Sequence, residues 1–273
     1  MSAAPTAPRD VPLEEEDLEV LLAGPPPPLG QRLRGVLLDP TQAFSRHDAG
    51  WGWVIPWVLV AGAGVLFGLL TLGKVDLAAR AAADFERGME QMPLAQRKQL
   101  EGNTEVKDML ETSQKFTAFL GKVALVAGPP LLGLVELVVF GGVAFLAGLV
   151  LGPPRGAPEL MRGISLAAWA SLAELPGWAA RAVAVLLGNP APTTSPLHLV
   201  DPFTSPVLAA VLSRLDPVVA YYYLLLGLGL IGSFRLAPRR AWLVVGGLWA
   251  LVSAQGVGLA LLSKLGQVMG GAS

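Results

Sequence analysis

The chain alternates between polar stretches and apolar stretches that are long enough to cross a lipid bilayer. Five apolar stretches stand out, at residues 54–73, 116–152, 163–188, 218–234 and 241–262. An α-helix rises ~1.5 Å per residue and the hydrocarbon core of a bilayer is ~30 Å thick, so about 20 apolar residues suffice to span it. The pattern therefore predicts an all-α fold, a polytopic membrane helix bundle with about five transmembrane helices.

The second apolar stretch is longer than one crossing requires, because it would form about 55 Å of helix. A Gly-Pro-Pro triplet at 128–130 divides it, and the part before the prolines is too short to span alone. We expect one span at 130–151, preceded by an overhanging or kinked turn that carries Lys122; a re-entrant piece before the span is the alternative. The third span, at 163–188, contains Pro176, where we expect a kink.

Small and aromatic residues mark two of the spans. In the first span, Gly64 and Gly68 form a small-xxx-small face that would let another helix approach closely. Three tryptophans at 51–57 precede or begin this span, and three tyrosines at 221–223 lie near one end of the fourth, at its start. Such rings are typical of anchors at the level of the lipid headgroups.

Two polar segments are predicted to lie outside the spans. Residues 1–28 are acidic and rich in proline, and they offer little apolar surface to offset the entropy of ordering, which predicts a disordered tail. Residues 74–115 carry nearly balanced charge on a helical period that breaks near its middle. This pattern predicts a polar helical hairpin after the first span.

Residues 29–50 form an amphipathic segment between the tail and the first span. Leu33 and Val36 recur at helical spacing beside Arg32 and Arg34. A short helix with this pattern lies on a membrane surface, with its apolar face down and its arginines near lipid phosphates. We therefore predict lipid-surface contacts for Arg32 and Arg34.

The composition agrees with a membrane protein. Hydrophobic residues make up 53% of the 273 residues, while charged residues make up 15%, against about 25% in an average soluble domain. The formal net charge of −1 gives no reason to expect a nucleic-acid partner. The chain contains no cysteine, which excludes disulfides, thiol nucleophiles and thiolate metal sites.

Arginine-rich segments set the predicted orientation. They precede the first span, separate the second from the third, and separate the fourth from the fifth, with Arg32, Arg34, Arg46, Arg155, Arg162, Arg235, Arg239 and Arg240. With five spans these three segments share one side, and short loops rich in Lys and Arg remain in the cytoplasm. We expect a multi-pass protein of the cell membrane with a cytoplasmic N-terminus.

No residue pattern indicates an enzyme. Gly227-x-Gly229-x-x-Gly232 matches a dinucleotide fingerprint in letters, but it lies within an apolar span, where glycine permits close helix packing. The two histidines, His47 and His198, are far apart in the sequence and have no metal-binding or Ser/His/Asp pattern around them. We therefore predict no catalytic residue, no cofactor and no metal site.

Ionisable residues within the apolar stretches are the candidates for function. They form a candidate intramembrane polar network that comprises Glu136, Glu174, Arg181, Asp216 and Lys122. A charge at mid-bilayer costs ~2.5–3.5 kcal/mol even on lenient insertion scales, so such residues normally face the bundle interior and pair. Glu174 and Arg181 lie two helical turns apart, too far to bond, and we predict a cross-helix pair between Glu136 and Arg181. The network either fixes the helix register or forms a proton or ion pathway.

Several short motifs follow one another in an order that a known family shares. The run LLDP at 37–40 is followed by Phe44, a Trp-rich start of the first span and the polar hairpin. The run LDP at 215–217 and a basic turn precede the last span. Their order and spacing, over about residues 35–262, resemble the bacterial branch of the Yip domain family (Ypt/Rab-interacting proteins). The resemblance implies a Yip-like membrane domain at 51–265.

The resemblance implies a non-enzymatic integral membrane protein, a membrane scaffold or a protein-interaction component. Its expected partners are membrane lipids and an unidentified membrane or cytoplasmic protein, without nucleic acid, while assembly into a homo-oligomer stays open. The alternative is a small-solute or ion permease component that uses Glu136, Glu174 and Arg181.

Overall fold

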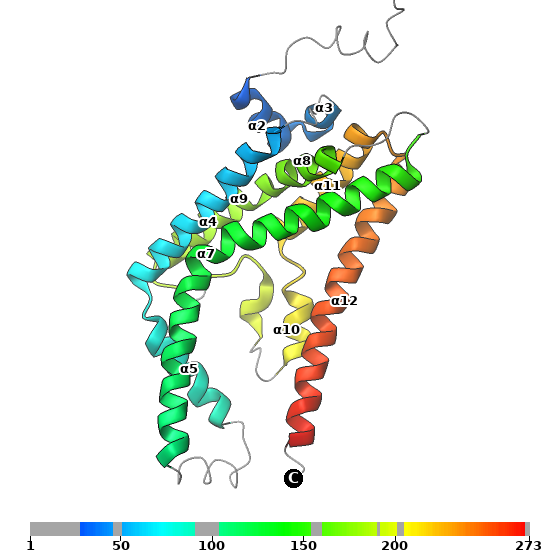
Figure 1. Ribbon diagram of the computed structural model, residues 1–273. Helices are drawn as coiled ribbons and strands as arrows, with labels where there is room; N and C mark the ends of the chain where they lie inside the picture. Colours follow the sequence, from blue (N-terminus) through cyan, green and yellow to red (C-terminus); the bar gives the residue numbers. More distant parts are fainter. Residues whose placement is uncertain are drawn as a thin grey trace, which may run out of the picture.

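The computed structural model describes the segments 28–45, 51–90, 104–153, 160–189, 192–200 and 205–270 (Figure 1). These residues are helical nearly throughout and contain no strand, which confirms the all-α fold class. The predicted tail lies outside them except for Pro28, and so does the centre of the predicted polar hairpin, at 91–103.

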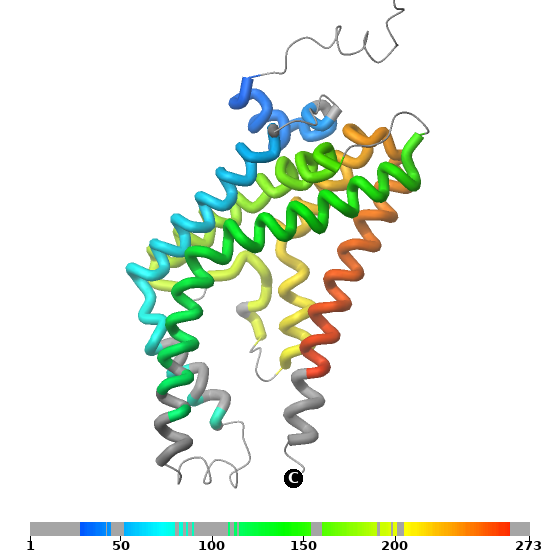
Figure 2. Tube along the Cα trace, in the orientation of Figure 1, coloured from blue at the N-terminus to red at the C-terminus, as the bar shows by residue number. Residues whose placement is uncertain are grey.

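The helices follow in the order α2 (Leu29–Leu38), α3 (Pro40–Ser45), α4 (Val54–Lys74), α5 (Leu77–Glu90), α7 (Thr104–Leu151), α8 (Leu160–Ala170), α9 (Glu174–Leu186), α10 (Pro206–Leu212), α11 (Pro217–Phe234) and α12 (Pro238–Gly270). Three short 3₁₀ helices join them, η1 (Trp51–Trp53), η2 (Ser171–Ala173) and η3 (Pro196–Leu199). Figure 2 traces the chain back and forth through α4, α7, α8–α9, α11 and α12, with α2 at one end of the molecule.

Four stretches of helix are long and apolar enough to cross a membrane, at Val54–Lys74, Lys115–Leu151, Pro217–Phe234 and Pro238–Leu262. They correspond to the first, second, fourth and fifth predicted spans. Large apolar side chains on their outer faces, such as Leu66 and Leu251, are more than half exposed. An apolar surface of this extent is typical of a face that meets lipid or another protein.

The third predicted span is helical but broken. α8 and α9 have 11 and 13 residues, and η2 separates them, so neither reaches the length of a spanning helix. Pro176 lacks the N–H that would bond to the Leu172 carbonyl, and its ring crowds the turn before it. The distortion expected at Pro176 is therefore found one turn earlier, as the tighter 3₁₀ turn of η2.

α7 is one continuous helix of 48 residues that contains Pro129 and Pro130. Figure 1 shows it bending sharply near the middle of its length, as expected where two prolines remove backbone hydrogen bonds. Within the described residues Thr104–Leu151, a single continuous, bent helix agrees with the predicted kinked helix and shows no separate piece before the span. The apolar part of the helix runs unbroken over Lys115–Leu151, so it extends well beyond the predicted span at 130–151.

α4 fits against the bend of α7 through two glycines. A methyl group at Gly64 would collide with the Pro129 ring, and one at Gly68 would collide with the Leu125 carbonyl oxygen. The Leu125 carbonyl would normally accept the N–H of the residue four positions later, but that residue is Pro129, which has none. A Cα–H group of the neighbouring helix can donate to this carbonyl only weakly. The predicted close-approach face of the first span is thereby confirmed, with α7 as its partner.

The core of the bundle lies around α8 and α11. Leu166 and Trp169 of α8 are almost completely buried. A methyl group at Gly229 of α11 would collide with Leu166, and Gly141 of α7 meets Gly163 of α8 backbone to backbone. Gly229 of the fourth span thus serves helix packing, as predicted.

α2 and α3 pack on the bundle. Val36 and Phe44 are 3% and 0% exposed. The Tyr221 hydroxyl donates to the Leu37 carbonyl at 2.7 Å, and the Ser233 hydroxyl donates to the Phe44 carbonyl at 3.0 Å. The predicted amphipathic helix is present, but its apolar face meets the bundle where we expected lipid.

The two arginines of α2 have different surroundings. The Arg32 guanidinium lies 4.8 Å from the centroid of the Trp169 ring, within the range of a cation–π contact. Arg34 is exposed. Arg32 is therefore turned toward the bundle, while a lipid-surface contact stays a prediction for Arg34.

Candidate functional site

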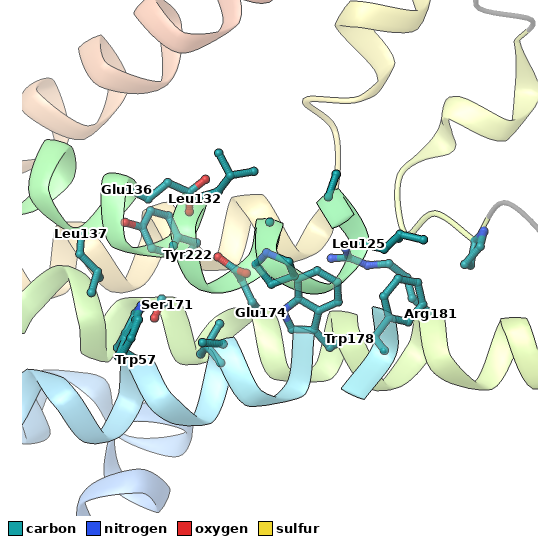
Figure 3. Close-up of a pocket in the computed structure, with 18 residues that line it drawn as sticks. Trp57, Leu125, Leu132, Glu136, Leu137, Ser171, Glu174, Trp178, Arg181 and Tyr222 are labelled. Carbon is teal, nitrogen blue, oxygen red and sulfur yellow. The ribbon is translucent and has the colours of Figure 1, made fainter. Parts of the chain in front are cut away.

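A cavity of about 370 Å³ lies between α4, α7, α9 and α11 (Figure 3). Small-molecule sites in proteins measure ~300–1,000 Å³, so this cavity has room for one small ligand. Glu136, Glu174 and Arg181 all line it. The structure therefore brings three of the five predicted network residues to one site.

One face of α9 carries the polar groups on one side of the cavity. Glu174, Trp178 and Arg181 lie at positions i, i+4 and i+7, which share a face of an α-helix. η2 adds Ser171 to the lining. The Ser171 hydroxyl already donates to the Ala168 carbonyl of α8 at 2.7 Å, so its hydrogen is used one turn back along the chain.

The Arg181 guanidinium stacks on an aromatic ring. It lies 4.3 Å from the centroid of the Trp178 ring, and its Nε is buried without a hydrogen-bond partner. The predicted pair with Glu136 is not formed, although the structure describes both side chains. Figure 3 shows Glu136 and Arg181 on opposite sides of Glu174.

The two carboxylates face the cavity from different helices. Glu174 begins α9 and is half-buried, with its carboxylate beside the Trp178 indole. Glu136 comes from α7 and is exposed, so it marks the opening of the cavity. The two negative charges are near enough to repel each other. A cation between them would relieve this repulsion.

The remaining walls are aromatic and aliphatic. α4 contributes Trp57 and Phe67, and α11 contributes Tyr222. The Phe67 ring lies 5.4 Å from the Trp178 ring, centroid to centroid. Pro129, in the bend of α7, also lines the cavity. The cavity therefore lies where α7 changes direction and its two halves diverge.

The other two predicted network residues lie elsewhere. Asp216 is the N-cap of α11, where its carboxylate accepts the Val218 N–H at 2.8 Å and the Thr194 hydroxyl. Lys122 is exposed on α7 and does not line the cavity. Asp216 thus serves the start of a helix, a structural role that its place before a proline already indicates.

The aromatic members of the site are absent from the predicted network. Tyr222 and Tyr223, predicted as headgroup anchors, are 8% exposed and pack against Phe140 with ring centroids 5.3 and 6.1 Å away. Trp178 could have been predicted from the sequence, because it lies four residues after Glu174 and three before Arg181 and so shares their helix face. The burial of the tyrosines has no comparable sequence signal.

Within the segments that the structure describes, no three His, Asp or Glu side chains gather closely enough to hold a metal ion. Comparisons with protein-family models, with curated proteins and with solved structures give no match. The chemistry of the cavity therefore has to be argued from its own geometry.

Proposed function

We propose that this chain is a non-enzymatic integral membrane protein of the Yip type, a scaffold or protein-interaction component of the cell membrane. The packing of α2 and α3 on the bundle is the observation that carries the proposal. The Leu37 and Phe44 carbonyls are hydrogen-bonded to α11, so a partner bound at α2 would be fixed to helices that lie in lipid.

The positions of the Yip-like motifs support this proposal. Leu37 and Phe44 belong to the first motif and contact α11 through their carbonyls. Asp216 and Pro217 belong to the last motif and start the same helix. Two motifs far apart in the sequence thus depend on one helix, as expected when both belong to a single fold.

Site-specific photo-crosslinking in membranes tests the scaffold role. A photoreactive amino acid in place of Arg34, which is exposed on α2, should give a discrete protein adduct. The matched control places it at Leu251, which is 68% exposed on α12 and should meet lipid. No adduct at Arg34, or the same adducts from both positions, would contradict the proposal.

The cavity favours a second candidate, a permease component for a small solute or ion. Three charged side chains line one space among apolar helices. Charged side chains are energetically costly among such helices, and those that occur there usually belong to a functional site. Uptake into proteoliposomes should then be lost on Glu136→Gln and kept on Lys122→Gln, because Lys122 is exposed outside the cavity. Absence of uptake together with an Arg34 adduct would favour the scaffold.

A further inference from the structure

The charges that line the cavity do not balance. Glu136 and Glu174 supply two negative charges and Arg181 supplies one positive charge, which leaves a formal charge of −1 when all three are ionised. An uncompensated charge among apolar helices is costly. A ligand that carries one positive charge would balance the site.

Arg181 does not neutralise Glu136 or Glu174 by direct contact. Its guanidinium lies against the Trp178 ring, 4.3 Å from the ring centroid, and no ion pair joins it to either carboxylate among these described side chains. Glu174 and Arg181 are also two helical turns apart, which places their backbones ~10 Å from each other. The space next to the carboxylates is therefore available to a cation from outside.

The aromatic walls indicate which kind of cation fits. The rings of Trp57, Trp178 and Tyr222 line the cavity, and the faces of such rings attract organic cations. An inorganic cation would need a shell of oxygen ligands. Beyond the two carboxylates, the side-chain oxygens among the described lining residues are the hydroxyls of Ser171 and Tyr222, which are too few for such a shell.

We propose that the cavity binds a monovalent organic cation with apolar or aromatic substituents. Its charge lies between Glu136 and Glu174, and its apolar part lies against Trp57 and Tyr222. The exposed carboxylate of Glu136 makes the first contact. The inference names a ligand class for the permease candidate, but it concerns binding alone and holds whether or not the cation crosses the membrane.

Equilibrium binding of radiolabelled tetraphenylphosphonium to the purified full-length protein in detergent tests the proposal. Tetraphenylborate has nearly the same shape and the opposite charge, and it is measured separately. We expect saturable binding of the phosphonium above that of protein-free micelles. The borate should bind no more than it does to those micelles.

Three charge variants separate the site from the surface. Glu174→Gln should weaken phosphonium binding at least tenfold, because it removes a charge a few ångströms from the ligand. Glu86→Gln, the same substitution at an exposed position of α5, should leave the affinity unchanged. Arg181→Gln removes the opposing positive charge and should tighten binding severalfold, a gain that a misfolded variant cannot give.

The proposal is overturned if phosphonium binding is not saturable, if the borate binds equally well, or if the affinity is the same for the wild type, Glu174→Gln and Arg181→Gln. Failure of uptake in proteoliposomes, with charge-selective binding intact, would remove the permease candidate and support a binding role for the cavity.

Discussion

At the scale of single residues, Trp178 holds together the polar side of the cavity. The Arg181 guanidinium stacks on its ring at 4.3 Å, the Phe67 ring lies 5.4 Å away, and the Glu174 carboxylate lies beside its indole. A cation–π contact contributes ~0.5–2 kcal/mol. The partner of Arg181 is therefore an aromatic ring, whereas we predicted the carboxylate of Glu136.

Replacing Trp178 tests this role. Trp178→Ala removes the stacking surface and leaves a void, so it should lower the unfolding temperature of the detergent-purified protein, with a loss of about 1–3 kcal/mol. Trp178→Phe keeps a ring against Arg181 and should cost much less. Equal losses in a thermal-shift assay would mean that stacking on Trp178 contributes nothing.

The charged members of the site were predictable from the sequence, but its aromatic members and the contacts were not. Charges within apolar stretches identified Glu136, Glu174 and Arg181, and helical spacing put the last two on one face. Spacing along one helix does not say which helix faces it, however. Arginine also binds aromatic faces as readily as carboxylates, so its partner could not be chosen from the sequence.

At the scale of helices, the contact between α4 and α7 depends on the absence of a side chain at Gly68. A methyl group there would meet the Leu125 carbonyl, which is backbone and cannot move aside as a side chain can. The two helices would have to separate just where α7 bends around the cavity. The contact is therefore sensitive to a single added carbon.

Gly68→Ala should destabilise the protein by about 1–3 kcal/mol, the usual cost of overpacking. Gly62→Ala is the matched control on the same helix, because a methyl group at Gly62 meets nothing within 4 Å. It should be neutral or slightly stabilising, since alanine favours helix. Thermal unfolding of both variants in detergent measures the difference, and a greater loss at Gly62 would contradict the described packing.

The attachment of α2 to α11 can be tested through one hydroxyl. Tyr221→Phe removes the donor to the Leu37 carbonyl and should cost ~0.5–1.5 kcal/mol. Limited proteolysis should then cut the N-terminal segment faster than in the wild type. Tyr222→Phe, whose ring lines the cavity, should leave that cleavage rate unchanged. Equal cleavage rates for wild type and Tyr221→Phe would count against the attachment.

Apolar length predicted four of the five expected spans correctly, because the bilayer sets that length physically, but it did not reveal that the third apolar stretch is broken into two short helices. The break at η2 was placed a few residues late, since a proline disturbs the turn before it. The docking of α2 was not predicted. An amphipathic helix shows which face is apolar, but lipid and a protein bundle are equally suitable partners for that face.

At the scale of the whole molecule, the arginine-rich segments gather at one end. Figure 1 shows α2, the start of α8 and the start of α12 there, and Arg240 donates to the Leu151 carbonyl at the end of α7 at 2.9 Å. A cation at the C-terminus of a helix is favourably placed. This arrangement agrees with the prediction that the three arginine-rich segments lie on one side of the membrane. The positive-inside rule predicts that this side is cytoplasmic.

Fusions of alkaline phosphatase, which is active only outside the cytoplasm, test this orientation. A fusion after Arg240, at the arginine-rich end, should be inactive. A fusion after Glu90, at the end of α5, should be active, because Figure 1 shows α5 at the opposite end. The reverse pattern of activity would invert the predicted topology while leaving the fold unchanged.

The central claim is that lipid surrounds the apolar helices, and spin labels can test it directly. The chain has no cysteine, so single-cysteine variants carry one nitroxide at a known place. In liposomes, labels at Val138 and Leu251, which are exposed on α7 and α12, should be reached by oxygen and shielded from a water-soluble nickel chelate. A label at Arg34 should show the opposite preference. If the chelate reached Val138 and Leu251 as readily as Arg34, these helices would face water, and the account would be contradicted.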